Sequence, residues 1–411
     1  MGRDKINSMT SENIWIFNHY ATKPDEPATR AFDFARELIL RNHKVTIFAS
    51  AFSHYKLTTK YLNPNENQKT EMVDGVKFVW VRSFSHKRNN WKRLMNMLSF
   101  SWRAYWIGKN VKEKPSIVLG SSVHPFAVIT AYLIAKNKKS RFFFEVRDLW
   151  PQTLIDMHFL GKNNPLAVIL RMIERFLYQR AEKIITLLPY AGNYITTLGI
   201  NREKIVWIPN GINMKRYENI KPYDGGNPAN FVFMYTGIHA KYANLDSVLF
   251  AAKIIQDQNR NNIKFIFVGD GSEKKNLIQI AKDMSLANVE FKDMVPKDQV
   301  FKMIEQADAL ISIIMDLPVL KYGISSNKLN DYLASGRPIV CAIKSGNNPV
   351  SDSGAGIVIE PGSSEILAKA FLEMVSFTPE KRIEMGQKGI DYIKKNYDIK
   401  VLADKMEELF I

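Results

Sequence analysis

A glycine-containing segment in the second half of the chain has the residues to hold an anionic group such as a phosphate. Tyr322 to Ser326 precedes a helix that we expect to begin near Asn327. Gly323 lets the backbone approach a ligand closely, and amide groups at a helix N-terminus attract anions. Lys328, in the first helical turn, and Lys241, in an earlier loop, are candidate catalytic cations. For both lysines the alternative is a solvated surface side chain.

A second polar cluster follows a predicted strand in the first half of the chain. Glu145, Arg147 and Asp148 leave the end of this strand together, a grouping that seldom serves packing alone. We expect Arg147 to be catalytic and to contact a substrate, with Glu145 or Asp148 orienting a hydroxyl group; an internal Arg147–Asp148 pair is the alternative. Arg30 and His124 lie at predicted element ends and are expected beside the same site, although His124 fits an ordinary loop equally well.

The elements that must position these residues are short apolar runs alternating with amphipathic stretches, the pattern of parallel sheets with crossover helices. The predicted strands of the first half cover residues 13–18, 44–50, 76–83, 116–122, 141–147 and 183–189, with a helix at 31–41. The pattern restarts in the second half, with strands at 230–237, 263–271, 288–295, 307–315, 337–343 and 355–361 and a helix at 245–258.

Chain length supports two domains, because 411 residues exceed the size of one ordinary core. We place the domains at 1–212 and 213–411, with the boundary between about Pro209 and Asn227. The predicted linker is IPNGIN (208–213) with the polar stretch from Asn219 to Asn230. The C-terminal helix, at about 390–411, is free to pack back on the first domain.

Composition limits the class of partner and compartment. The formal net charge of +16 favours nucleic acid, an anionic membrane surface or phosphorylated substrates, with a generally basic proteome as the alternative. No recognised nucleic-acid-binding module accompanies the charge, so we predict no nucleic-acid partner. No apolar run reaches about 18 residues and no signal peptide is predicted. The single cysteine, Cys341, excludes an internal disulfide and fits a reducing compartment.

One basic helix, predicted over 88–108, has the composition of a helix that lies at a membrane surface. It combines aromatic anchors with cations for anionic headgroups. The alternative is a helix that packs its tryptophan face into the domain core. The predicted membrane contacts are Trp91, Lys92, Arg93, Trp102, Arg103 and Trp106.

Six stretches, in order over nearly the whole chain, together resemble family 4 glycosyltransferases. In the first half they are TRAFDFARELILRNHKVTIFAS (29–50), EVRDLWP (145–151) and IPNGIN (208–213). In the second half they are YTGIHAKYANLD (235–246), VGDG (268–271) and YGISSNKLNDYLASGRPIV (322–340), which is the strongest single match. The branch most similar is that of bacterial O-antigen and capsule enzymes, which includes N-acetylfucosaminyl transferases.

The resemblance implies an α/β protein of GT-B fold, with two Rossmann-like, doubly wound parallel-sheet domains facing each other across a cleft. The first domain would bind the acceptor and the second a nucleotide sugar, expected to be a UDP-sugar. Asp331 would bind the ribose hydroxyls, with an intrahelical pair to Lys328 as the alternative, and Asp270 would line the donor or cap a helix. The implied donor-binding residues are Gly237, Gly269, Asp270, Met294, Gly323, Ile324, Ser325, Ser326, Asn327 and Asp331.

The implied reaction moves an N-acetylated or deoxy sugar, with retention of configuration, to a polyprenyl-diphosphate-linked saccharide. A leaving phosphate oxygen would take the acceptor proton, so no enzymic nucleophile is required. The protein would work as a peripheral protein on the cytoplasmic face of the inner membrane. No two aspartates in the chain are separated by a single residue, so the Asp-x-Asp metal site of many glycosyltransferases is missing. We therefore predict no metal and no cofactor.

The chain departs from the family pattern at six positions. At Asn42 the family usually has a glycine. Gly323 and Asp331 stand where the family has two glutamates with seven residues between them, and Ile238 and Ala243 stand where it has an arginine and a lysine. Arg147 occupies the place of a common histidine. Two other classes remain open: a sugar-nucleotide 2-epimerase of the same fold, and a non-catalytic sugar-nucleotide-binding protein.

Overall fold

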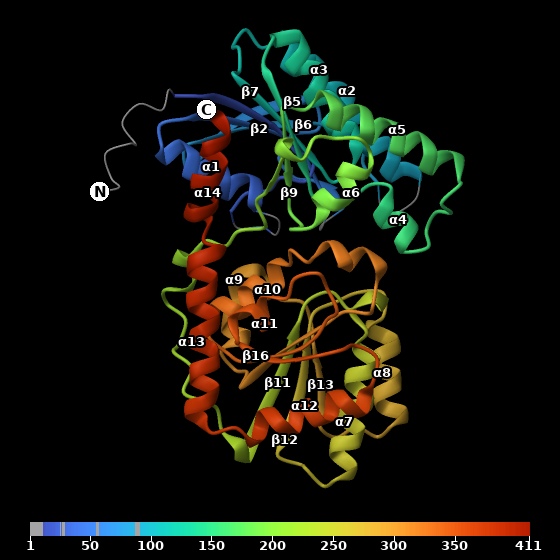
Figure 1. The fold of residues 1–411 in the computed structure, drawn as a ribbon, viewed down its shortest axis with the longest axis vertical. Coiled ribbons are helices and arrows are strands. Elements are labelled where there is room, and N and C mark those ends of the chain that lie inside the picture. Colours follow the sequence, from blue (N-terminus) through green and yellow to red (C-terminus); the bar gives the residue numbers. More distant parts are fainter. Residues whose placement is uncertain (1–10, 25, 27–28, 55–56, 87–90) are drawn as a thin grey trace. The chain divides into compact units, whose positions relative to one another are not determined.

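The computed structural model describes residues 11–24, 26, 29–54, 57–86 and 91–411 (Figure 1). The chain divides into two compact units. Unit 1 comprises Met1–Pro209 and Ile399–Ile411, and unit 2 comprises Asn210–Asp398. The division thus falls just before the predicted boundary at 212, and the chain returns to unit 1 at Ile399 rather than near residue 390.

An eight-stranded sheet forms the centre of unit 1, in the order β10-β9-β8-β7-β1-β2-β6-β5. Neighbouring strands are parallel except β5 and β6, which form an antiparallel edge. The strands are β1 (Asn13–Phe17), β2 (Lys44–Ser50), β5 (Gln68–Val73), β6 (Val76–Val81), β7 (Ile117–Ser122), β8 (Arg141–Val146), β9 (Lys183–Thr186) and β10 (Ile205–Trp207). A short antiparallel pair, β3 (Phe52–Ser53) and β4 (Thr58–Thr59), lies outside this sheet.

Helices cover both faces of the unit 1 sheet, as its buried parallel strands require. On one face α1 (Arg30–Leu40) and α14 (Ile399–Glu407) share a core with Ile16, Ile47 and Trp80. The other face carries α2 (Trp91–Asn110), α3 (Pro125–Lys138) and α5 (Pro165–Arg180), and both α2 and α5 pack against α3 (Figure 1). The short helices α4 (Gln152–Asp156) and α6 (Ala191–Thr197) flank α5 in the chain.

Unit 2 contains a six-stranded, wholly parallel sheet in the order β13-β12-β11-β14-β15-β16. The strands are β11 (Phe231–Thr236), β12 (Ile263–Val268), β13 (Val289–Lys292), β14 (Ala309–Ile313), β15 (Ile339–Ala342) and β16 (Gly356–Ile359). One face packs against α7 (Leu245–Asp257), α8 (Lys274–Asp283) and α12 (Ser364–Ser376). The other packs against α9 (Lys297–Ile304), α10 (Asn327–Ala334), α11 (Pro349–Ser353) and α13 (Pro379–Asn396).

These two Rossmann-like sheets confirm the predicted α/β class, and every predicted strand is present. The sequence does not predict β5, which is polar and exposed because it lies at the sheet edge. An Asp74–Gly75 turn with positive φ at both residues joins β5 to β6, and this dipeptide is a hairpin signal. Asn42 also has a positive φ (67°), which explains how it replaces the family's glycine before His43.

The predicted linker, residues 208–213 and 219–230, lies in unit 2 from Asn210 onward. Residues 210–227 belong to unit 2, where the Tyr223 hydroxyl donates to the Asp308 carbonyl (2.6 Å) and Arg382 donates to the Gly225 carbonyl (2.6 Å). Among the described residues, no helix combines the length and the apolar character that a bilayer crossing requires.

Candidate active site

Two loops of unit 2 pack backbone against backbone where β11 and β12 end. Gly237 follows β11 with φ of 140°, and Gly269 follows β12 with φ of 148°. A Cβ atom on Gly269 would lie 1.9 Å from the Gly237 carbonyl oxygen, and one on Gly271 would lie 2.3 Å from the His239 carbonyl oxygen. Only glycine allows these approaches, so the sequence builds a narrow backbone-lined edge at the carboxyl ends of the strands.

Lys274, in the first turn of α8, ties this edge to the next strand. Its Nζ donates to the carbonyls of Gly269 (2.8 Å) and Lys292 (3.2 Å) and to Asp293 (2.7 Å). Asp270 does not cap α8, because that helix begins later, and its carboxylate accepts from the Gly271 amide (2.7 Å). Met294, beyond β13, is exposed.

The segment before α10 is held from two sides. The Ser326 hydroxyl caps α10 by accepting from the Leu329 amide (3.4 Å), which places the helix start at Asn327 as predicted. Gly323 has a φ of 107°, a conformation that favours glycine. The amide of Ile324 donates to Asn347 (2.7 Å), so this amide is already used and the prediction that it faces a diphosphate is corrected.

Asn210, the first residue of unit 2, is joined to the same segment. Its amide donates to the Ser325 hydroxyl (2.8 Å), and its side chain donates to the Ser325 carbonyl (2.8 Å). Asn330 on α10 donates to the Asn210 carbonyl (2.8 Å). The Pro-Asn-Gly turn therefore positions the loop before α10, and Asn330 is a positioning residue that sequence reasoning missed.

Lys328 extends from α10 to the end of β11. Its Nζ lies 4.1 Å from the centre of the Tyr235 ring, and a Cβ on Gly237 would lie 3.4 Å from its Cδ. Burial lowers the pKa of the Lys328 ammonium to about 7. The lysine is therefore brought to the glycine loop, where an arriving anion would stabilise its charged form. Lys241, by contrast, is exposed at the start of a 3₁₀ helix, η4 (Lys241–Ala243).

Asp331 is half-buried and accepts a hydrogen bond from the Tyr217 hydroxyl. The structure therefore gives Asp331 a tyrosine partner from outside its own helix, in addition to the intrahelical neighbour Lys328 that the sequence offers. Tyr217, which ends the 3₁₀ helix η2 (Met214–Tyr217), carried no sequence signal for this contact.

His239 is a further residue that the sequence analysis did not predict. Its side chain is fully buried between the two glycine loops, and neither ring nitrogen has a hydrogen-bond partner. Burial, followed by the charge of Lys274, lowers its pKa to about 4, so the ring is neutral. The sequence feature that could have identified His239 as a site residue is its position two residues after Gly237.

In unit 1, Glu145 and Arg30 are buried against each other. The Arg30 Nε donates to Glu145 (2.9 Å), and the Ser121 hydroxyl donates to the other carboxylate oxygen (2.7 Å). Arg30 also donates to the carbonyls of Ile208 (3.0 Å) and Pro209. Burial alone would raise the pKa of Glu145, but Arg30 and then Arg147 outweigh it and lower the pKa.

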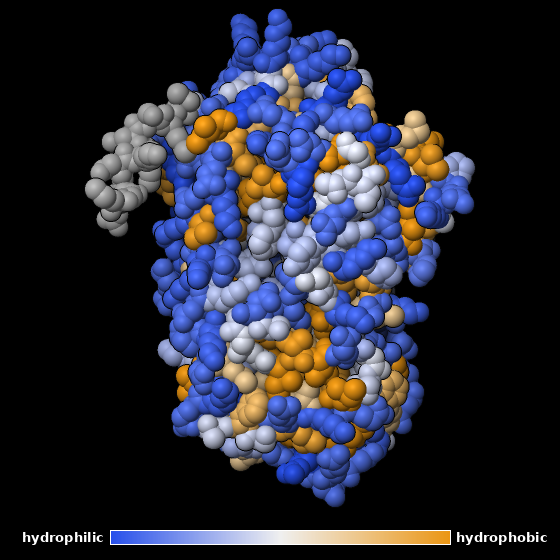
Figure 2. Space-filling view, in the orientation of Figure 1, coloured by the Kyte–Doolittle hydropathy of each residue, from blue (hydrophilic) through white to orange (hydrophobic). Residues whose placement is uncertain are grey.

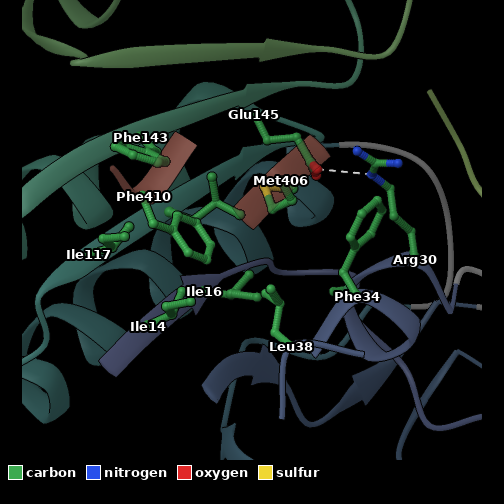
Figure 3. A pocket seen from close by; sticks show the side chains of 12 residues that line it. Ile14, Ile16, Arg30, Phe34, Leu38, Ile117, Phe143, Glu145, Met406 and Phe410 are labelled. Carbon is green, nitrogen blue, oxygen red and sulfur yellow. Dashed lines mark hydrogen bonds and ion pairs between the residues drawn. The ribbon is translucent and has the colours of Figure 1, made fainter. Parts of the chain in front are cut away.

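This ion pair borders a small void of about 20 Å³. The other walls of the void are apolar and include Phe34, Met406 and Phe410, which lie around the pair in Figure 3. The sequence predicts Arg30 and Glu145 on the wall of an acceptor site. The structure instead places them in the interior. There they join the end of β8 to Ile208 and Pro209, the residues that follow β10.

His124 is likewise an interior residue rather than an ordinary loop side chain. It is the N-cap of α3, accepting from the Ala127 amide (3.4 Å), and its Nε2 lies 2.6 Å from Nδ1 of His19. His19 stacks on Phe100 of α2, with ring centroids 4.6 Å apart. Burial lowers the pKa of His124 to about 3 and that of His19 well below its usual value, so both rings are neutral.

A pocket of about 300 Å³ opens at the carboxyl ends of the unit 1 strands. Arg147 and Arg93 both line it, and Arg93 donates to the Tyr20 hydroxyl (3.4 Å). Aromatic rings and hydroxyl groups form much of the remaining wall. The pocket residues are His19, Tyr20, Ala21, Thr22, Glu26, Ser50, Phe52, Ser53, His54, Tyr61, Arg93, Val123 and Arg147. Asp148 is exposed and does not line this pocket.

Helix α2 presents its tryptophans to solvent. Trp91 and Trp102 are each 65% exposed and Trp106 is 43% exposed, whereas Met97 and Phe100 form the buried side. The alternative of a tryptophan face packed into the core is therefore wrong. Two predicted membrane contacts are also corrected: Arg93 faces the pocket, and Arg103 donates to the Arg82 carbonyl (3.2 Å). Lys92 remains on the exposed side, and the predicted part of this helix before Trp91 lies outside the described residues.

No group of three histidine, cysteine or acidic side chains in the described part of the chain is arranged to hold a metal ion. The metal-independent reaction stays a prediction.

Comparison with known proteins agrees with this two-unit arrangement. The profile of Glycosyltransferase Family 4 matches residues 28–216, and that of glycosyl transferases group 1 matches residues 230–376. The putative colanic acid biosynthesis glycosyl transferase WcaI of Escherichia coli K12 is 22% identical over 295 residues, covering 67% of this chain and 70% of WcaI.

Solved structures are similar over almost the whole chain. Sucrose-phosphate synthase of Thermosynechococcus elongatus is similar with a TM-score of 0.73 at 13% identity, over 97% of this chain and 98% of that one. Anabaena Alr3699/HepE in complex with UDP has a TM-score of 0.67 at 13% identity, with the same coverage. These similarities confirm the GT-B fold class. The chain is thus similar to Glycosyltransferase Family 4 over residues 28–216 and to glycosyl transferases group 1 over residues 230–376, within a GT-B fold.

Proposed function

We propose that the protein is a retaining, metal-independent glycosyltransferase that uses a UDP-sugar. The observation that carries the proposal is that Lys328, in the first turn of α10, reaches the glycine loop at the carboxyl end of β11, while Asp331 follows three residues later on the same helix. A cation beside closely approaching backbone suits a diphosphate, and a carboxylate suits the vicinal ribose hydroxyls. HepE, a protein of similar fold, has been solved with UDP, which supports the choice of nucleotide.

The chemistry assigned to the chain is electrostatic. Lys328 would stabilise the charge that develops on the diphosphate as the sugar–phosphate bond breaks. A phosphate oxygen then accepts the acceptor hydroxyl proton on the face that the donor leaves, and the configuration is retained. Gly323, at a position where the family has a glutamate, is compatible with this route because no enzymic carboxylate forms a covalent bond.

The acceptor we propose is a polyprenyl-diphosphate-linked saccharide of cell-surface polysaccharide synthesis. The unit 1 pocket combines Arg147 and Arg93 with aromatic rings, which suits an anionic group next to a sugar. WcaI, whose name assigns it to colanic acid biosynthesis, supports this class of pathway. The exposed tryptophans and Lys92 of α2 would hold the protein, as a peripheral protein, on the cytoplasmic face of the inner membrane.

The decisive experiment incubates the purified protein with a panel of UDP-, GDP- and ADP-sugars, with and without a polyprenyl-diphosphate-linked monosaccharide and with a chelator throughout. NMR follows donor consumption and product configuration. We expect nucleoside diphosphate release only with acceptor, from a UDP-sugar, and a product that retains the donor's anomeric configuration. Donor conversion without acceptor would identify an epimerase, and donor binding without conversion in either case would identify a non-catalytic module.

Two variants test the donor site in the same assay. Lys328→Ala and Asp331→Ala should each lower turnover at least tenfold, since each removes a charge-assisted contact worth about 1.5–3 kcal/mol. Lys264→Ala, an exposed lysine on β12, is the matched control and should leave turnover unchanged. Unchanged turnover in both site variants contradicts the donor-site assignment.

A further inference from the structure

A second apolar surface lies on helix α5, separate from the tryptophans of α2. Its exposed hydrophobic residues recur at the helical spacing, and each is between 42 and 67% exposed. Phe159, in the turn before this helix, is 69% exposed. The residues on α5 are Leu166, Val168, Ile169, Met172 and Phe176. Figure 2 shows hydrophobic atoms gathered over α4 and α5 at the upper right, with strongly hydrophilic atoms among them.

The exposed charge along α5 and the turn before it has a single sign. Between residues 157 and 181 the chain carries Lys162, Arg171, Arg175 and Arg180, and its only carboxylate is Glu174. Glu174 is buried and accepts hydrogen bonds from the hydroxyls of Tyr178 and Tyr194, both at 2.9 Å. The helix therefore presents apolar and cationic side chains but no carboxylate to solvent.

The cations border a hollow beside the apolar residues. This open hollow of about 400 Å³ lies between α5 and the end of α6, with Arg171 and Arg175 on one wall and Leu198 and Gly199 on the other. Val168 and Met172 continue its apolar lining. A phosphate group with an attached hydrocarbon chain matches this combination, because arginines bind phosphate and the apolar wall accepts acyl chains.

We propose that the α5 surface docks on an anionic lipid bilayer, with lipid phosphates at Arg171 and Arg175 and the apolar residues inserted among the acyl chains. α3 packs between α2 and α5 and exposes Leu133, so the three helices carry two apolar ridges on one layer of unit 1. Two contacts bind a membrane far more firmly than one. The inference rests on the proposed function for placing the protein at a membrane and adds the surface that makes the second contact.

Vesicle co-flotation of the full chain, without donor or acceptor, tests the proposal independently of catalysis. Vesicles of phosphatidylcholine are compared with vesicles in which 30% of the lipid is phosphatidylglycerol. We expect binding to the anionic vesicles, reduced at least tenfold by Ile169→Gln with Met172→Gln. Arg175→Gln, which removes one of the two arginines placed at the lipid phosphates, should also weaken binding and reduce its dependence on salt. Because the variants change exposed side chains, they should keep the wild-type melting temperature.

Matched controls on unit 2 are Ile366→Gln with Ile383→Gln and Lys394→Gln with Lys395→Gln, all at exposed positions, which should bind like wild type. Absence of vesicle binding, equal binding to neutral vesicles, or full binding by the α5 variants overturns the proposal. So does a concentration-dependent dimer that the α5 variants abolish while vesicle binding survives. Transferase activity is measured separately on a water-soluble acceptor, so a vesicle-binding protein with no activity refutes the proposed function and leaves the α5 proposal standing.

Discussion

The Lys328 ammonium lies 4.1 Å from the centre of the Tyr235 ring, in a site where burial lowers its pKa to about 7. A nearby aromatic face stabilises the cation only in part, so at slightly alkaline pH the folded protein holds much of this lysine neutral. An anion that binds beside it would favour the protonated form.

We therefore expect a UDP-sugar to bind with uptake of a proton between about pH 7.5 and 8.5, because its diphosphate raises the depressed pKa of Lys328. Titration calorimetry in buffers of different ionisation enthalpy measures this uptake, and a UDP-sugar has no phosphate that titrates in this range. Lys328→Met should lose the uptake. Proton uptake of the same size in that variant contradicts the assignment.

The same lysine makes a prediction about stability. Its pKa is about 7 in the folded chain and 10.5 in the unfolded chain, so between these values the unfolded state binds one more proton. The free energy of unfolding should therefore rise from about pH 7 toward pH 10, with a smaller rise in Lys328→Met. Thermal unfolding of both proteins across this range checks it.

Tyr217→Phe tests how Asp331 is held. The variant removes the hydroxyl that donates to the Asp331 carboxylate, and so removes one contact that orients this carboxylate for its proposed ribose partner. We expect KM for the donor to rise roughly threefold to tenfold, from about 1 kcal/mol for one hydrogen bond, while kcat stays within twofold. The matched control is Tyr223→Phe, which removes one hydroxyl bond to the Asp308 carbonyl at the opposite end of the sheet. An equal rise in both variants would indicate a general structural effect.

Arg147→Gln and Arg93→Gln test the unit 1 pocket. Each removes a cation that lines the proposed acceptor pocket, so KM for a diphosphate-linked acceptor should rise roughly tenfold or more. The dissociation constant of the donor, measured by calorimetry, should not change. Arg103→Gln, on the same helix as Arg93 but bonded to the Arg82 carbonyl, is the control. A changed donor affinity in Arg147→Gln would instead assign this residue to the donor site.

Glu174→Gln tests a buried carboxyl group. Burial raises the pKa of Glu174 from 4.5 to about 8, so the folded state holds a proton that the unfolded state has released over this range. Stability of the wild type should fall as pH rises from about 4.5 to 8. The variant keeps partners for Tyr178 and Tyr194 without this loss, so its melting temperature should exceed that of wild type at pH 8 and approach it at pH 5. Glu373→Gln, at an exposed position, should behave like wild type.

Much of the fold could be predicted from the sequence because buried parallel strands are continuous apolar runs, as in β2 and β12. The edge strand β5 could not, since its QKTEMV segment faces solvent and carries no apolar run. The domain boundary near Pro209 could be predicted from the composition of the chain. The assignment of residues 210–227 to unit 2 was not, because contacts such as Tyr223 with Asp308 join residues far apart in the chain.

The candidate site, like the fold, could be predicted from the sequence only in part. Positions within one loop or helix, such as Gly323 and Ser326, follow from local spacing. The partners of a residue do not follow from local spacing. Glu145 could be recognised as a candidate site residue, but only the fold brings Arg30 against it and buries the pair. Arg93 shows most clearly what the sequence does not reveal. The composition of its helix predicts a membrane contact, but the orientation of the helix places the Arg93 side chain on the wall of a pocket.

The return of the chain to unit 1 at Ile399 has a consequence for biosynthesis. The last residues, among them Leu402, Met406 and Phe410, complete the apolar core beneath α1. A ribosome releases them only after all of unit 2 has been made, so unit 2 is complete in sequence while unit 1 still lacks one wall of its core. The second unit to be synthesised is thus the first able to finish folding, and a fragment ending near residue 212 would carry an open hydrophobic face.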